Sequence, residues 1–183
     1  MDATLNPEAR IAAADAFAET AHTGQFRKYL VGVPYIVHPR AVAAIVASVP
    51  HEVEQVQAAL LHDTIEDCGV THEQIERKFG AEVARLVWAL TDQAPRTLNR
   101  KARKAWERDR LAQEDAKVQT VKIADLSDNV PSIVAGDRDF GRIFAEEART
   151  LLDALLLADA TLRLRLAGLL DAANLEVAGF SRT

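Results

Sequence analysis

The sequence predicts an all-α fold, built as one domain of roughly eight to ten helices. Apolar residues recur every three to four positions along most of the chain, and proline or glycine separates the periodic runs. No run alternates apolar and polar residues between turn signals, as a half-buried strand would. Hydrophobic residues make up 49% of the 183 residues and charged residues 27%, a balance that excludes an intrinsically disordered chain.

Helix start and stop signals divide the first half of the chain. Asn6 is predicted to cap a helix whose first position is a proline. Thr71 and Gln74 have the spacing of a capping box, which is predicted to begin a short helix. Gly80 is predicted to end that helix. The helices predicted here cover about residues 6–22, 39–49, 52–67, 71–80 and 81–92.

The second half begins after Pro95, which is predicted to interrupt the helical pattern. A basic helix is predicted over about residues 99–113, and a helix with an apolar stripe over about 115–134. Residues 140–174 have a helical pattern whose length indicates two helices or one kinked helix. The leucines of 151–170 recur at three and four residues, which predicts a buried face that completes the core, with a homodimer interface as the alternative.

Charge and cysteine usage exclude several classes of protein. Cys68 is the only cysteine, which excludes an internal disulfide framework and a zinc site built from cysteines. The formal net charge of −5 argues against a polybasic nucleic-acid binder, although residues 96–110 are locally basic. Acidic residues interrupt the N-terminal apolar run, and Asp153 and Arg163 interrupt the leucine-rich stretch, so we expect no signal peptide and no membrane span. These observations predict a cytoplasmic protein.

The most informative segment places four ionisable residues close together. At about 100° per residue, Glu66, Asp63 and Asp67 fall at roughly 40°, 100° and 140° from His62. Carboxylates crowded in this way repel one another, and a bound cation would relieve the repulsion. Imidazole and carboxylate groups are suitable ligands for a transition metal. The alternative is a solvent-exposed acidic face that ends a helix, which is weakened because a helix C-terminus disfavours negative charge.

Two further segments carry conspicuous polar residues. Residues 21–39 read A-H-T-G-Q-F-R-K-Y-L-V-G-V-P-Y-I-V-H-P, and residues 122–129 read K-I-A-D-L-S-D-N. In the second segment, Lys122, Asp125 and Asn129 share a narrow sector of the helix beside its apolar stripe.

These strings, in this order, resemble the HD-type phosphohydrolases, and specifically the guanosine-tetraphosphate hydrolase domain of the RelA/SpoT homologue family. Members carry A-H-x-G-Q-x-R-K, G-x-P-Y-x-x-H-P, A-A-L-L-H-D-x-x-E-D, a short helix ending in F-G, and K-x-A-D-x-x-x-N. Residues 8–135 carry the resemblance, and 136–183 are expected to form a C-terminal helical extension of the same domain, 1–183. No synthetase half follows in this sequence, so the chain resembles the stand-alone small alarmone hydrolases.

The resemblance implies an HD-type helical bundle that hydrolyses the 3′-pyrophosphate of guanosine alarmones, giving GDP or GTP and pyrophosphate. It implies one Mn²⁺ ion as cofactor, with other divalent transition metals as alternatives, and the ligands His22, His62, Asp63 and Asp125. The catalytic acid/base pair is implied to be Glu66 and Asp67. Nucleotide contacts or pocket-framing positions are implied for Arg27, Lys28, Tyr35, His38, Lys122 and Asn129.

Several of these assignments have alternatives. Arg27 and Lys28 could be solvated loop cations, and His38 could cap the helix that follows it. The basic residues of 96–110 could steer phosphate groups or could form a solvated helix face.

One segment departs from the family pattern. Between Asp125 and Asn129 the family carries a basic residue, leucine, and histidine or tyrosine, whereas this chain has Leu126, Ser127 and Asp128. The missing positive charge and the added negative charge put the substrate in question. The alternatives are a phosphomonoester such as the 2′-phosphate of NADPH, another nucleotide, or a nucleotide-sensing module with weak activity.

Overall fold

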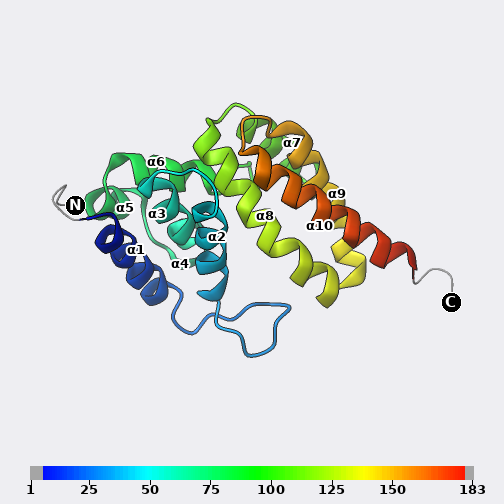
Figure 1. The fold of residues 1–183 in the computed structure, drawn as a ribbon, viewed down its shortest axis with the longest axis horizontal. Coiled ribbons are helices and arrows are strands. Elements are labelled where there is room, and N and C mark those ends of the chain that lie inside the picture. Colours follow the sequence, from blue (N-terminus) through cyan, green and yellow to red (C-terminus); the bar gives the residue numbers. More distant parts are fainter. Residues whose placement is uncertain (1–5, 180–183) are drawn as a thin grey trace.

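The computed structural model describes residues 6–179, with side chains described as far as residue 174, and it is helical almost throughout (Figure 1). Among these residues no strand occurs, and Phe26 and Pro34 form an isolated bridge, which confirms the all-α prediction. Within the described part of the chain, no helix is both long and apolar enough to cross a membrane. The helices are α1 (Pro7–Ala21), α2 (Val37–Ala47), α3 (Val53–Leu61), α4 (Thr64–Cys68), α5 (His72–Phe79), α6 (Ala81–Leu90), α7 (Arg100–Leu111), α8 (Ala116–Gly136), α9 (Arg138–Ala154) and α10 (Ala160–Gly179).

The predicted caps are present. The side chain of Asn6 accepts a hydrogen bond of 2.8 Å from the backbone N–H of Ala9, which begins α1. Thr71 and Gln74 form the reciprocal capping box of α5. Gly80 ends α5 with φ +94°, a conformation that residues with a Cβ rarely adopt. The second helix begins at Val37 and not at the proline two residues later, because a proline is tolerated in the first turn.

The helix predicted over 52–67 is wrong in one respect, because the structure divides it. α3 ends at Leu61, and α4 begins at Thr64. The hydroxyl of Thr64 donates a hydrogen bond of 2.7 Å to the carbonyl of Leu61, which is a local alternative to the regular helical ladder. Glu66 and Asp67 therefore lie in the first turn of α4, so the argument that a helix C-terminus opposes them does not hold.

The C-terminal stretch forms two helices. α9 ends before Leu155, and α10 begins after Asp159, whose side chain accepts a hydrogen bond of 3.1 Å from the backbone of Leu162. Leu155, Leu162 and Leu166 belong to the main hydrophobic core, so this region completes the core as predicted. The homodimer interface, its alternative, stays a prediction.

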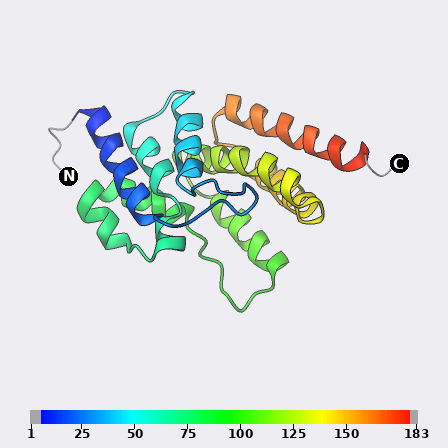
Figure 2. The ribbon, with the colours of Figure 1, turned by 90° about the horizontal axis from the view of Figure 1, so that it is seen from below.

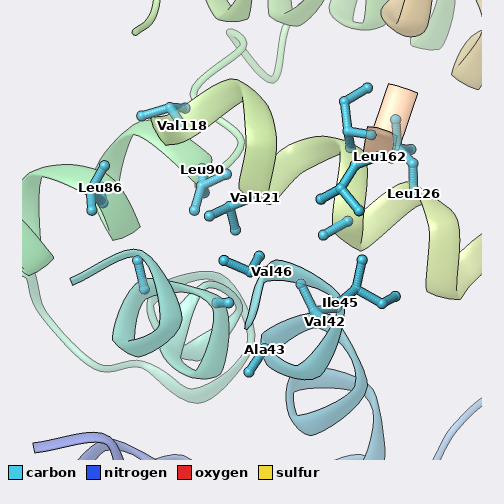
Figure 3. Packing of buried hydrophobic residues seen from close by; sticks show 14 of the residues in the cluster. Val42, Ala43, Ile45, Val46, Leu86, Leu90, Val118, Val121, Leu126 and Leu162 are labelled. Atoms are coloured by element: carbon cyan, nitrogen blue, oxygen red, sulfur yellow. The ribbon is translucent and has the colours of Figure 1, made fainter. Parts of the chain in front are cut away.

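The long helix α8 is the centre of the molecule, with α2 and α3 on one side and α9 and α10 on the other (Figures 1 and 2). Val42 and Val46 of α2 and Val121 of α8 lie at their interface, and α6 and α10 add Leu90 and Leu162 to the same core (Figure 3). Burial on both sides fixes the rotation of α8 about its axis. Its polar residues are therefore presented to the α1–α2 loop and to the turn between α3 and α4.

Candidate active site

The turn between α3 and α4 holds the first two residues of the site. His62 is buried, and its Nδ1 donates a hydrogen bond of 2.8 Å to the carbonyl oxygen of Ala59. A carbonyl only accepts, so the neutral ring carries its hydrogen on Nδ1 and has its lone pair on Nε2. That Nε2 atom is buried without a hydrogen-bond partner and lies 3.1 Å from Oδ2 of Asp63.

The start of α2 contributes a second imidazole. His38 is 1% exposed, and its Nδ1 lies 2.6 Å from the carboxylate of Asp128, which only accepts. Its Nε2 atom lies 3.3 Å from Oδ1 of Asp125 and 3.6 Å from Oδ2 of Asp63. The ring centroids of His38 and His62 are 5.1 Å apart. The two histidines therefore present their Nε2 atoms to the same pair of carboxylates.

Helix α8 contributes Asp125, the fourth residue of the site, and two side chains that hydrogen-bond to it. Asp125 accepts hydrogen bonds of 2.8 Å from Lys122 and 2.7 Å from the side-chain amide of Asn129. These three residues lie one helical turn apart, as the spacing predicted. Across the site, the hydroxyl of Tyr35 donates a hydrogen bond of 2.5 Å to Asp63. Both carboxylates are thus oriented before any ligand binds.

Charges in this buried cluster shift the acidities strongly. Burial lowers the pKa of His38, but hydrogen bonds to Asp125 and Asp128 outweigh it and raise the pKa to about 9. For His62, burial likewise lowers the pKa, and the charge of Asp63 raises it above its ordinary value. Burial raises the pKa of Asp125, but Lys122 and the histidines hold it well below its ordinary value. The carboxylates of Asp63, Asp125 and Asp128 therefore favour positive charge at the point where the two rings meet, whether on the rings or on a bound cation.

The geometry fits a divalent metal. His38, His62 and Asp63 each offer a ligand atom, and these atoms lie within 4.8 Å of one another. The Nε2 atom of His62 is buried and has no hydrogen-bond partner among the described residues, so its lone pair can bind a metal. Asp125 lies 3.3 Å from one ring nitrogen of this group and 3.8 Å from the other. Nitrogen and oxygen ligands without thiolate suit Mn²⁺, Fe²⁺ or Zn²⁺ by ligand type.

His22, which the resemblance placed among the ligands, is not brought into this group. It follows α1, where its Nδ1 lies 2.7 Å from Oε1 of Gln25 and 3.2 Å from Sγ of Cys68. Its ring packs beside Tyr35, with centroids 4.7 Å apart. The structure instead brings His38 to the carboxylates, because α2 starts directly against the middle of α8.

Glu66 and Asp67 line a cavity of about 210 Å³ together with Asp63 and Asp125. Burial, and then the negative charges of Asp63 and Glu66, raise the pKa of Asp67 above its ordinary value. A carboxylate of raised pKa beside the cluster can accept and return a proton. The structure thus places this pair beside the candidate metal site, on a helix that begins later than predicted, and its catalytic role stays a prediction.

The positions predicted to contact substrate divide into two groups. Tyr35 and Asn129 line both this cavity and a second one of about 170 Å³, and Lys122 lines only the first. Arg27 and Lys28 line only the second cavity, together with Tyr29, Ser132 and Ile133. His38 is buried and lines neither cavity.

Most cations of the basic segment 96–110 are paired with acidic side chains. Arg103 donates to Asp92 at 2.5 Å and Arg100 donates to Glu147 at 2.7 Å. Lys104 is exposed and lines the first cavity as well as a neighbouring hollow of about 270 Å³. Lys104 is therefore the residue of this segment best placed to meet an anionic ligand at the mouth of the cavity.

Two buried histidines that face two aspartates inside a helical bundle are the arrangement of a candidate metal-binding helical domain. Residues 14–151 match the HD domain family, and the chain belongs to that family.

Named relatives are similar to this chain over about two thirds of its length. A guanosine-3′,5′-bis(diphosphate) 3′-pyrophosphohydrolase of Vibrio cholerae is 40% identical over 134 residues, which is 71% of this chain and 19% of that protein. The human guanosine-3′,5′-bis(diphosphate) 3′-pyrophosphohydrolase MESH1 is 39% identical over 122 residues, 64% of this chain and 65% of that protein. This chain therefore spans about a fifth of the bacterial relative and somewhat less than two thirds of the human one.

The fold is also found in a solved structure, described as a metazoan ortholog of SpoT that hydrolyzes ppGpp. It matches with a TM-score of 0.84 and 25% sequence identity, covering 94% of this chain and 99% of that one. The match therefore extends over nearly the whole of both chains.

Proposed function

We propose that this protein hydrolyses the 3′-pyrophosphate of a guanosine alarmone with a bound divalent metal. The observation that supports it is the convergence of His38, His62, Asp63 and Asp125 beside the Glu66–Asp67 pair. The relatives named for this reaction add support, because they are 40% and 39% identical to this chain over 71% and 64% of its length. The proposed ligand set replaces His22 of the resemblance with His38.

The metal, when bound, would lower the pKa of a water molecule and neutralise phosphoryl charge. We propose Mn²⁺ for this role, which suits the nitrogen and oxygen ligands. Glu66 and Asp67 line the cavity next to the proposed ligands, where either carboxylate can orient an attacking water and remove its proton. Water attacks the phosphorus bonded to the 3′ oxygen, that P–O bond breaks, and the 3′ oxygen leaves with a proton. The products are GDP or GTP and pyrophosphate.

A second candidate is the hydrolysis of a phosphomonoester such as the 2′-phosphate of NADPH. Its support is that cations near the cavities are already paired, because Arg27 is bonded to Asp128 and Lys122 to Asp125. A substrate with fewer phosphate charges demands fewer free cations. Arg103 is occupied in the same way by Asp92.

The test is a substrate panel with and without Mn²⁺, in which pyrophosphate and orthophosphate are measured separately. Release of pyrophosphate from ppGpp supports the first candidate, and orthophosphate from NADPH alone supports the second. The variant Glu66→Gln/Asp67→Asn should lose turnover and keep substrate binding, whereas Glu76→Gln, an exposed change on α5, should leave turnover unaltered. Unchanged turnover in the double variant would refute the roles given to this pair.

A further inference from the structure

Asp128 replaces the histidine or tyrosine of the family pattern, and it lies at the centre of a partly buried network of hydrogen bonds. Its Oδ2 atom lies 2.6 Å from Nδ1 of His38 and 3.2 Å from the guanidinium of Arg27. The Asp128 side chain is 24% exposed and that of Arg27 only 9%. The two partners belong to different parts of the α1–α2 region, so one carboxylate holds both of them against α8.

The bond to His38 determines which ring nitrogen is available. An imidazole that donates from Nδ1 to a carboxylate has its lone pair on Nε2, the atom that faces Asp63 and Asp125. Among the described residues, no other hydrogen bond to Nδ1 of His38 is found. Without the carboxylate, the neutral ring could carry its hydrogen on Nε2, where it would block a metal. A carboxylate behind a metal-bound histidine generally orients the ring in this way.

The bond to Arg27 orders the wall of the second cavity. The guanidinium also donates hydrogen bonds of 3.0 Å to Asn129 and 3.0 Å to Ser132. Three acceptors on one face of α8 therefore fix its position. The charge of Arg27 is balanced by Asp128 within this wall.

We propose that Asp128 is a positioning residue that fixes the Nδ1–H tautomer of His38 and clamps Arg27 against α8. The inference rests on the proposed function only in assigning the Nε2 atom of His38 to the metal. Asp128, where the chain departs from the family pattern, thus connects the candidate metal cluster, through His38, to the wall of the second cavity, through Arg27.

Two measurements test it without an activity assay. Mn²⁺ affinity is measured by titration, and the tautomer of His38 by long-range ¹H–¹⁵N NMR of the metal-free protein at a pH above the pKa of that ring. Asp128→Ala should weaken Mn²⁺ binding by about 10- to 100-fold and populate the Nε2–H tautomer. Asp128→Asn keeps an acceptor for Nδ1–H, so it should stay within a few-fold of wild type and keep its tautomer.

Two control variants complete the experiment. Asp153→Ala removes one exposed negative charge that lines neither cavity, and it should leave Mn²⁺ affinity unchanged. Arg27→Gln loses the clamp and keeps the bond to His38, so its Mn²⁺ affinity should stay within a few-fold of wild type. A wild-type ring with its hydrogen on Nε2 would overturn the inference, as would Asp128→Ala behaving like Asp153→Ala. Failure of the wild type to bind Mn²⁺ would contradict the proposed function, and the NMR result would still decide the role of Asp128.

Discussion

Replacing Tyr35 by phenylalanine removes one hydroxyl from the centre of the candidate site and leaves the aromatic ring in place. That hydroxyl donates a hydrogen bond of 2.5 Å to Asp63, whose side chain is 19% exposed. Burial and the charge of Asp63 raise the pKa of Tyr35, so the hydroxyl stays protonated and remains a donor. We expect Tyr35→Phe to destabilise the metal-free protein because the half-buried carboxylate of Asp63 loses a partner.

The size of the effect follows from the surroundings of Asp63. A hydrogen bond to a charged group contributes about 1.5–3 kcal/mol net. The ring nitrogens of His62 and His38 remain 3.1 and 3.6 Å from the same oxygen and continue to balance its charge. The expected loss in the free energy of unfolding therefore lies at the lower end of that range, about 1.5–2 kcal/mol.

The assay is urea unfolding followed by circular dichroism, at neutral pH and with a chelator present. Tyr29→Phe is the matched control, because the hydroxyl of Tyr29 is buried without a hydrogen-bond partner and its removal should be neutral or slightly stabilising. Equal losses in the two variants, or no loss in Tyr35→Phe, would refute the view that this hydroxyl supports Asp63.

Three further predictions concern the helical scaffold. Leu61→Ala should lower the free energy of unfolding by about 3–5 kcal/mol, because the fully buried side chain leaves a cavity behind the turn, whereas Leu61→Met should lower it by less than about 1.5 kcal/mol in the same denaturation assay. Gly80→Ala should destabilise by about 1–3 kcal/mol because φ is +94° there, while Gly168→Ala, in open space on α10, should be neutral or stabilising, and equal effects on thermal unfolding would contradict this reasoning. The hydrogen bond from Arg85, opposed by slight burial, lowers the pKa of Glu82 to about 2, so its contribution is present above the ordinary pKa of 4.5 and is lost as pH falls through 2. Because the pair is exposed, Glu82→Gln should cost less than about 1 kcal/mol at neutral pH, and unfolding measured down the pH scale should show that difference vanish in acid.

Local signals made the helices predictable. Asn6, Thr71 and Gly80 act on backbone groups within a few residues of themselves, so their effect can be derived from the sequence alone. The division of the third helix was missed because it depends on one hydroxyl, that of Thr64, whose bond to Leu61 competes with the regular ladder.

The choice between the two histidines could not be made in the same way. His22 and His38 lie at opposite ends of a largely irregular segment, where spacing does not say which ring turns inward. The helical spacing in α8 did place Asp128 near Asp125, which was the available signal. It could not show that Asp128 faces His38, since that depends on how α2 packs against α8.

The sequence by itself determined the all-α class, most helix boundaries and the chemical groups that gather on the polar face of α8. These properties follow from interactions between residues about one helical turn apart. Only the tertiary structure decided that His38 joins the carboxylate cluster and that Asp128 holds it there. The two residues are separated by 90 positions in the chain, and they meet because burial of the apolar faces of α2 and α8 brings their polar edges together.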